Sequence, residues 1–383
     1  MKEGWEVKKL GEVATYINGY AFKPAQWGDS GVPIIRIQNL NNSDALHNYY
    51  DGEIPNKYVV EYGDILISWS ASLGVYEWKG QRSYLNQHIF KVVFDKIDIN
   101  KYFLKYAVSG KLAEMLKDAH GATMKHVVKK DFDNTKIIYP PLPEQSRIVE
   151  ELDLLSNIIE KKRKQLSELD NLAQSIFYDM FGDPVTNEKG WEVKTLGQIA
   201  NFKNGVNFQK VDNGFEHLFL SVSDFKDNIK LTQKSDFSVI LVNEPIDEDY
   251  LLLDDDIVFV RSNGSKSLVG RNVIVYTNGE KITYSGFCIR CRIMLENLLP
   301  IYVNNLLSSY SIKLLIKNLG RGANISNLNQ TMLSSVPIIL PPLSLQQLFA
   351  QKIEAIEKQK ALIKQSIAET EELFNSRMDY YFS

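Results

Sequence analysis

At residues 137–145 the chain reads Ile-Ile-Tyr-Pro-Pro-Leu-Pro-Glu-Gln, and at residues 338–346 it reads Ile-Ile-Leu-Pro-Pro-Leu-Ser-Leu-Gln. After each copy, apolar residues recur at alternating four- and three-residue steps over about 38 residues, or roughly 57 Å of helix at a rise of about 1.5 Å per residue. This spacing is typical of a coiled-coil seam. Neither helix can bury its apolar stripe alone, so we predict that the two long helices pack on each other.

The two predicted helices share one register. Adding 201, the difference between Pro341 and Pro140, moves each seam position of the first helix onto one of the second. The apolar seam positions are Ile148, Leu152, Leu155, Ile159, Leu166, Leu169 and Ile176 in the first helix and Phe349, Ile353, Ile356, Ile363, Ile367 and Phe374 in the second. The second seam is more polar toward its end, with Thr370 and Arg377. We interpret the helices as copies of one element.

A second repeat opens each half of the chain. Residues 4–14 read Gly-Trp-Glu-Val-Lys-Lys-Leu-Gly-Glu-Val-Ala, and residues 190–200 read Gly-Trp-Glu-Val-Lys-Thr-Leu-Gly-Gln-Ile-Ala, at an offset of 186 (190 minus 4). The chain is therefore interpreted as a tandem duplication in which a globular body precedes each long helix. Because the offset grows from 186 to 201, the second body carries 15 more residues, and loops tolerate such insertions.

The predicted organisation has four segments. They are a first body at 1–141, a long helix at 142–182, a second body at 183–342 and a second long helix at 343–383. Strands bounded by turn residues are expected at 33–37, 64–69, 88–94, 217–222, 257–260 and 287–293. One helix should follow the strands of each body, from Asn100 to about Asp118 and from about Pro300 to Asn318. Each body is thus predicted to be a mixed α/β (α+β) domain.

The composition is that of a globular protein and gives no direct sign of a ligand. Its 383 residues suffice for two or three domains, and 44% of them are hydrophobic. Two cysteines argue against a disulfide framework, and without a signal peptide or a long apolar run we expect a cytoplasmic protein that contacts no membrane. With a net charge of −3, DNA binding would have to use local patches or positive charge from a partner.

Residues typical of catalysis or metal binding occur only in incomplete patterns. Residues 139–142, Tyr-Pro-Pro-Leu, resemble a motif of amino-methyltransferases but lack the leading Asn or Asp that would accept from the target amine, so a turn at the helix start is favoured. Cys288 and Cys291 lie three apart in a predicted strand and would face opposite sides. The aspartates at 254–256 are interpreted as a solvated turn, because Asp64 holds the matching position in the first body. We therefore predict no catalytic or metal site.

Polar side chains at strand ends and in two glycine-containing loops are the best candidates for a DNA interface. Glycine lets the backbone approach a phosphate, while basic and amide side chains bond to phosphates or base edges. The candidates in the first body are Arg36, Gln38, Asn39, Ser68, Trp69, Ser70, His120, Thr123, Lys125 and His126. Those in the second body are Ser223, Arg261, Ser262, Asn263, Ser265, Lys266, Arg321 and Asn324. The alternatives left open are surface loops without a partner and, for Trp69, partial burial in the core.

The two bodies match in their framing segments but differ at these candidates. Arg36 and Gln38 align with Ser221 and Ser223 of the second body. One scaffold is therefore predicted to present two different surfaces.

The combination of motifs resembles the specificity subunit of type I restriction-modification systems. The resemblance covers essentially the full length and rests on the Gly-Trp-Glu-Val-x-x-Leu-Gly opening of each half, the Pro-Pro-Leu-Pro-Glu-Gln start of the first long helix, and the duplicated order of body and helix. It implies two target-recognition domains, each reading one half of a bipartite DNA site, and an antiparallel coiled coil that spaces them with pseudo-two-fold symmetry. The start of the second helix, Pro-Pro-Leu-Ser-Leu-Gln, departs from the pattern because it lacks Pro-Glu.

The resemblance also implies which partners and cofactors to expect. The partners are double-stranded DNA, two modification (methyltransferase) subunits and, through them, restriction subunits. S-adenosylmethionine would bind to the modification subunit, and ATP and Mg to the restriction subunit, so this chain would hold no cofactor and catalyse no reaction. Two alternatives stay open from the residues: a coiled-coil scaffold that binds only proteins, and a self-contained DNA methyltransferase or nuclease.

Overall fold

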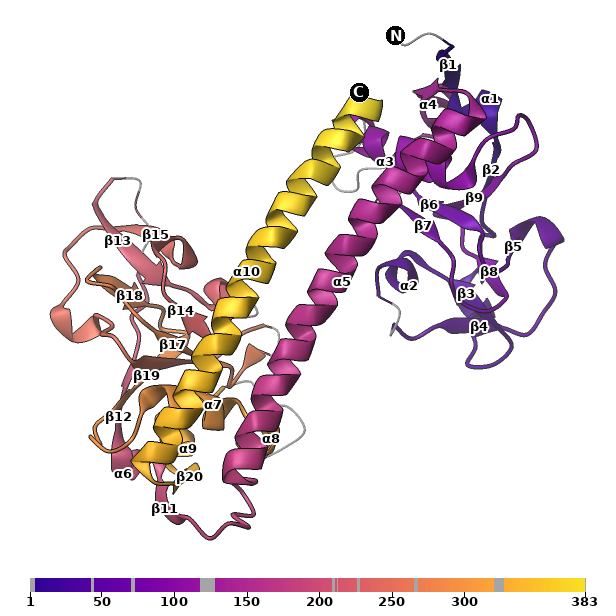
Figure 1. Cartoon of the computed structure of the whole chain (residues 1–383). Coiled ribbons are helices and arrows are strands. Elements are labelled where there is room, and N and C mark those ends of the chain that lie inside the picture. Colours follow the sequence, from indigo (N-terminus) through magenta and orange to yellow (C-terminus); the bar gives the residue numbers. More distant parts are fainter. Residues whose placement is uncertain are drawn as a thin grey trace. The chain divides into compact units, whose positions relative to one another are not determined.

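The computed structural model describes residues 4–42, 45–69, 73–117, 128–208, 211, 213–225, 228–264, 268–319 and 327–382 (Figure 1). The chain forms two compact units, one made of Met1–Arg163 with Lys364–Ser383 and the other of Lys164–Ile363. The long helices α5 (Leu142–Phe181) and α10 (Leu343–Phe382) are each divided between the units. Each unit therefore contains one body, the start of one long helix and the end of the other. Within the described ranges, no helix has the length and apolar content needed to cross a bilayer.

The strands of the first unit form one two-stranded and two four-stranded sheets. The small sheet pairs β1 (Glu6–Lys9) with β10 (Lys136–Tyr139). The larger sheets have the orders β2-β9-β6-β7 (Thr15–Asn18, Ile89–Val93, Ile65–Ser68, Gly74–Glu77) and β4-β3-β8-β5 (Asn48–Tyr50, Val32–Ile35, Ser83–Leu85, Val59–Val60). The helices of this body are α1 (Leu10–Val13), α2 (Ile37–Asn41), α3 (Lys101–Lys117) and α4 (Lys129–Asn134).

The second unit repeats this plan with a larger central sheet. A small sheet pairs β11 (Glu192–Thr195) with β20 (Pro337–Leu340). The other sheets have the orders β12-β19-β16-β17-β14 (Ala200–Asn204, Cys288–Ile293, Asp256–Val260, Asn272–Val275, Lys230–Leu231) and β15-β13-β18 (Ser238–Val242, Phe215–Leu220, Ile282–Tyr284). The helices are α6 (Leu196–Ile199), α7 (Pro300–Ser308), α8 (Tyr310–Leu319) and α9 (Gln330–Ser334), with the 3-10 turn η3 at Val222–Asp224. The predicted mixed α/β class and tandem arrangement are confirmed.

The six strands expected from the sequence are all present, as β3, β6, β9, β13, β16 and β19. Strand β13 begins and ends two residues before its expected range. In both bodies the first of these strands runs parallel to a later one, β3 to β8 and β13 to β18. The shared topology supports duplication of the entire body.

The two sequence repeats meet in space within each unit. Glu6 of the opening repeat pairs with Tyr139, just before the Pro-Pro step, and Glu192 pairs with Leu340 in the second unit. Both pairings are antiparallel, so the opening of each half is hydrogen-bonded to the strand that leads into its long helix. The sequence repeats therefore mark the structural frame that holds the start of each long helix.

A buried glutamine fastens the start of each long helix. The Gln145 side chain accepts from the backbone N–H of Asn100 at 2.9 Å and donates to the carbonyl of Pro140 at 2.8 Å. Gln346 accepts from Leu299 N–H at 2.9 Å and donates to Pro341 O at 2.8 Å. Each glutamine thus ties the N-terminus of a body helix, α3 or α7, to the Pro-Pro turn. The glutamine is present in both repeats, so the missing Pro-Glu of the second copy leaves this bond intact.

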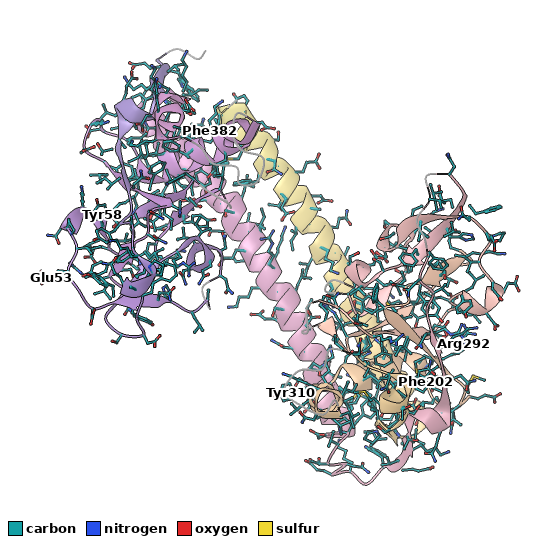
Figure 2. All side chains as sticks on the ribbon, turned by 180° about the vertical axis from the view of Figure 1, so that it is seen from behind. Glu53, Tyr58, Phe202, Arg292, Tyr310 and Phe382 are labelled. Atoms are coloured by element: carbon teal, nitrogen blue, oxygen red, sulfur yellow. The ribbon has the colours of Figure 1, made fainter. Side chains whose placement is uncertain are left out.

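The end of each long helix completes the body of the other half. Phe382, at the end of α10, is buried in the first unit and lies 5.5 Å from Phe103 of α3, centroid to centroid (Figure 2). Phe181, at the end of α5, is buried in the second unit and lies 4.8 Å from Tyr302 of α7. Gly182 ends α5 with a φ of 77°, a left-handed conformation that glycine adopts readily at a helix C-terminus. Each body core therefore includes an aromatic side chain from a helix that belongs to the other sequence repeat.

Within each unit the two helices run antiparallel, as predicted. In the first unit Glu151 bonds to Arg377 at 2.8 Å, whereas Lys162, further along α5, donates to the earlier residue Thr370 of α10 at 3.2 Å. The thirteen apolar seam positions are all buried or half-buried along the described helices. The helix residues that lie between the seam positions include many exposed ones, as a two-helix seam requires.

The seam of the second unit contains a buried charge. Lys360 is 4% exposed and bonds to Asp170 at 2.8 Å and to Glu357 at 2.9 Å. Burial opposes its charge, but these two carboxylates raise the pKa of Lys360 above its ordinary value. A single buried polar position in an apolar seam fixes register, because a shifted pairing would leave the ammonium without a partner.

The helix expected from Pro300 to Asn318 is two helices. Ser309, between α7 and α8, has an extended conformation with φ −64° and ψ 149°. The break leaves backbone groups that α5 satisfies: Gln174 donates to Ser308 O at 3.4 Å, and Ser311 N–H donates to the Tyr178 hydroxyl at 3.3 Å. Side chains from α5 thus stabilise a break that the local sequence does not signal.

The extra residues of the second body are spread over several segments. Ile35 corresponds to Leu220, an offset of 185, whereas Ile65 corresponds to Ile257, an offset of 192. The segment between these strands is therefore seven residues longer in the second body (192 minus 185). A single inserted loop does not explain the growth in length.

We predict that replacing either buried glutamine lowers stability. Gln346→Ala and Gln145→Ala each leave the N–H of a half-buried residue and a buried carbonyl without their side-chain partner, which costs about 1–3 kcal/mol. Thermal unfolding followed by circular dichroism measures the loss. The matched control is Gln351→Ala, at an exposed glutamine of α10, which should stay within about 0.5 kcal/mol of the parent chain. Equal stability of Gln346→Ala and the control would contradict the role of this bond.

Candidate nucleic-acid interface

Three segments converge at one place in each body through the same backbone bonds. In the first body, Asn86 N–H donates to Ile35 O at 3.2 Å, which joins the β8–β9 turn to the end of β3. In the second body, Ser285 N–H donates to Leu220 O at 3.0 Å at the matching place. The third segment is the end of β6 or β16. We call each meeting point the convergence site of its body.

The end of the central strand is bonded to the same turn in both bodies. Trp69 N–H donates to His88 O at 3.5 Å, and Arg261 N–H donates to Phe287 O at 2.7 Å. Asn18-Gly19 recurs as Asn204-Gly205 at the same offset of 186, and both glycines lie against these turns. A Cβ at Gly19 would stand 2.1 Å from Asn86 O, and one at Gly205 would stand 2.2 Å from the matching oxygen. The Asn-Gly recurrence therefore reflects close backbone contact at the convergence site.

The first-body convergence site presents a fixed cation and an exposed amide. Arg36 is half-buried, stands 4.7 Å over the Trp27 ring and donates to Asn48 Oδ1 at 3.1 Å. Gln38 is exposed and donates to Leu46 O at 3.3 Å. Held side chains of these types suit phosphate or base-edge contacts, because they lose little freedom on binding.

Three further candidates of the first body serve its interior. Asn39 is 5% exposed, and its side chain accepts from Arg36 N–H at 3.0 Å and donates to Ala45 O at 3.1 Å. Ser68 is fully buried in β6. Trp69 is half-buried and stacks on Phe90 at 5.8 Å, the core alternative that the sequence left open. Their bonds and burial give these side chains a structural role in the body.

The structure adds two residues that the sequence analysis missed. Gln87 and His88 are exposed in the β8–β9 turn, their side chains 3.2 Å apart, and the His88 ring lies 5.4 Å from Trp69. A turn gives no periodic signal. One clue was available: Gln87-His88 of the first body align with Gly286-Phe287 of the second, and each pair lies at the start of a predicted strand.

The second-body convergence site surrounds a pocket of 660 Å³. The predicted residues Ser223, Ser262 and Asn263 line it together with Phe208 and Phe287. On one wall Ser223 Oγ lies 2.6 Å from Ser221 Oγ. Arg261 is half-buried at the adjoining strand end, where its carbonyl accepts from Leu328 N–H at 2.8 Å. The structure thus brings Ser223 together with the run Arg261-Ser262-Asn263, which begins 38 residues later in the sequence (261 minus 223).

Helix α8 adds a basic surface to the second body. Residues 297–353 contain no aspartate or glutamate. Lys313 and Lys317 are exposed on α8, which begins at the exposed Tyr310 labelled in Figure 2. Packing around its side chain, and then the charge of Arg271, lower the pKa of Lys313. A helix with two exposed lysines and no acidic side chain of its own favours binding of an anion such as a DNA phosphate.

Nine predicted residues lie outside the described part of the chain. They are Ser70, His120, Thr123, Lys125, His126, Ser265, Lys266, Arg321 and Asn324.

The residues that were considered for catalysis and metal binding make other contacts in the described part of the chain. The Pro140 carbonyl accepts a hydrogen bond from the Gln145 side chain, so the Pro-Pro turn takes part in the structural contact at the start of α5. Cys288 and Cys291 are buried in different hydrophobic clusters, on opposite faces of the sheet as predicted. No group of three His, Cys, Asp or Glu residues in the described ranges is placed to hold a metal.

The aspartate turn at 254–256 is only partly solvated. Asp254 and Asp255 are exposed, but Asp256 is fully buried and binds Arg292 through two bonds of 2.7 Å. The interpretation of all three as a solvated turn is wrong for Asp256, because strand β19 supplies a cation across the sheet. Figure 2 labels Arg292 on that strand.

A family model described as type I restriction modification DNA specificity domain matches residues 2–170 and 188–372. The chain belongs to this family. The two matched ranges confirm the predicted tandem of target-recognition domains. They also confirm that the chain is a type I specificity protein, as its motifs indicated.

Curated relatives carry the same description. The StySPI specificity subunit of Salmonella potsdam is 24% identical over 390 residues, covering 93% of this chain and 82% of the relative. The EcoBI specificity subunit of Escherichia coli is 28% identical over 174 residues, covering 45% of this chain and only 36% of the relative. Both are specificity subunits of type I restriction enzymes, which agrees with the prediction of a non-catalytic subunit.

Solved structures show the same fold. The S subunit of a type I restriction-modification system from M. genitalium matches with a TM-score of 0.52 at 15% identity, covering 99% of this chain and 96% of that one. A chain from a study of complex assembly and conformational transition of the type I R-M system matches with a TM-score of 0.56 at 17% identity, covering 100% and 98%.

We predict that the α8 lysines contact DNA phosphates. Lys313→Ala with Lys317→Ala should weaken binding to specific and unrelated sequences by the same factor and should reduce the salt slope of the binding constant by about 1 per lysine. Fluorescence anisotropy over a salt series, with the modification subunit present, measures both.

The matched control is Lys234→Ala, an exposed lysine of the same body that pairs with Glu280 at 3.6 Å. It should leave the salt slope unchanged. A double variant with the parent slope would exclude phosphate contact by α8.

Proposed function

We propose that this chain is the DNA-reading, non-catalytic subunit of a type I restriction-modification complex. Residues 1–141 and 183–342 would each read one half of a bipartite double-stranded site. The observation that carries the proposal is the convergence site. Two bodies with the same backbone bonds present Arg36, Gln38 and His88 in one case and Ser223 and Phe287 in the other. A scaffold that reads two unlike half-sites needs a constant frame with variable side chains.

The helices at 142–182 and 343–383 are proposed to space the two readers and to dock two modification subunits, with restriction subunits bound through these. Antiparallel pairing within each unit supports a duplicated docking surface, since each unit offers one helix start and one helix end. S-adenosylmethionine, ATP and Mg belong to the partner subunits in this proposal. Two free cysteines agree with a reducing, cytoplasmic setting.

The partner is expected to supply much of the affinity. The net charge of −3 opposes binding to a polyanion, and the basic surface described on α8 is local. The purified chain alone should therefore bind DNA weakly, and modification subunits should raise affinity and discrimination. A gel shift with and without these subunits tests this. A complex that prefers one DNA sequence supports the proposal against a scaffold that binds only proteins. Binding of adenosylmethionine by the chain alone would favour a self-contained methyltransferase.

We predict that the two readers are modular. Replacing residues 15–136 by the matching body of another family member should change one half-site of the methylated motif and leave the other, because the frame that joins body to helix is retained. Single-molecule sequencing of modified adenines reports the motif. A simultaneous change of both half-sites would contradict the two-reader proposal.

We predict a smaller, local effect for a single side chain. Arg261→Ala should relax one base position of the second half-site at a cost of about 1–3 kcal/mol, because one base contact contributes about that much. Competition binding with single-base variants of the site measures the relaxation. The first half-site serves as the internal control. Relaxed specificity in the first half-site instead of the second would contradict the prediction.

A further inference from the structure

The pocket of the second convergence site has an apolar wall. Its 660 Å³ volume is bounded by the side chains of Val206, Phe208, Phe219, Val222, Ile240 and Phe287. The rings of Phe208 and Phe219 meet edge to face at 5.8 Å, so this part of the wall is firmly packed. No charged residue is found among the described residues that line the pocket. Its polar groups are the hydroxyls and amides of serine and asparagine.

Phe287 is the exposed part of this wall. Its residue surface is 55% exposed, although phenylalanine is ordinarily buried in a body of this size. Its backbone is fixed, since its N–H donates to Ser285 Oγ at 3.2 Å and its carbonyl accepts from Arg261 N–H at 2.7 Å. Folding therefore holds an apolar ring at the surface at the place where three segments converge.

The first body has a different chemistry at the equivalent position. There the β8–β9 turn carries Gln87 and His88, and the neighbouring segment carries Arg36 and Gln38. All four side chains make hydrogen bonds, as do most groups that read base edges. The second body replaces the histidine with Phe287, a group that neither donates nor accepts.

An exposed apolar wall on a DNA reader needs an apolar partner on the DNA. In the major groove the C5 methyl of thymine is the apolar group displayed by the four bases, and phenylalanine is among the side chains that contact it. Phosphates and the other base edges present charges, donors or acceptors. The chemistry of the pocket therefore matches thymine.

We propose that Phe287 and the apolar wall of this pocket receive a thymine methyl group in the second half-site, which makes Phe287 a specificity-determining residue. The proposal rests on the proposed function, since it assigns a chemical partner to the second reader. It also implies that the two readers differ: the second recognises a methyl group in addition to hydrogen-bonding groups.

The test replaces thymine by deoxyuridine, which removes only the methyl group. The complex of the full chain with modification subunits is titrated with its own site, substituted at each thymine of either half-site in turn. At one or more second-half thymines, the parent complex should lose about fourfold in affinity, the value for one buried methyl-sized group. Phe287→Ala should lose the same factor on the unsubstituted site and nothing further on the deoxyuridine site.

Two variants make the comparison specific. Phe215→Ala removes another phenylalanine of the same body, 53% exposed and outside the pocket, and should keep the parent response to deoxyuridine. Phe287→Leu keeps an apolar contact and should retain most of the methyl effect. A parent complex that ignores deoxyuridine at every second-half thymine, or a Phe287→Ala variant that keeps the full loss, overturns the proposal. Failure of the proposed function looks different, because the complex would then prefer no sequence at all.

Discussion

One buried glutamine side chain joins the three parts of each unit. Gln145 and Gln346 each connect the Pro-Pro turn, the N-terminus of the body helix and the first turn of the long helix. Both side chains are buried, and an unpaired amide is costly in a buried place. The direction in which a long helix leaves its body therefore depends on a side chain that both donates and accepts a hydrogen bond, as an amide does. The strand pairing of each opening repeat then supports the same turn from outside.

The frame is alike in the two bodies because its side chains bond to backbone groups at matching places. Lys91 donates to the carbonyl of Val59 at 2.7 Å, and Arg290 donates to the carbonyl of Leu251 at 3.2 Å in the other body. The two cations differ, yet each fixes the same strand to the same neighbour. At the convergence sites no such duty applies to Gln87 or Phe287, so these positions are available to recognition.

The sequence was sufficient for the duplication, the long helices and most central strands, because these depend on repeats and on apolar periodicity. It could not signal the break at Ser309, since the groups that stabilise it come from α5, more than a hundred residues earlier. It also placed Asn39 and Ser68 among the DNA candidates because polarity alone does not reveal burial. The turn at His88 was missed for the opposite reason: its role comes from neighbours that only the fold brings together.

The exchange of helix ends has a consequence for biosynthesis. The core of the first unit includes Phe382 beside Phe103. The first body ends at Pro141, so Phe382 follows it by 241 residues (382 minus 141). At about 5–20 residues per second, a ribosome takes roughly 10–50 s to supply it. During that interval the nascent first body exposes an apolar surface that chaperones can bind. The first unit therefore completes its core only after α10 has been synthesised. In a chain interrupted before α10, the apolar surface of the first body stays exposed.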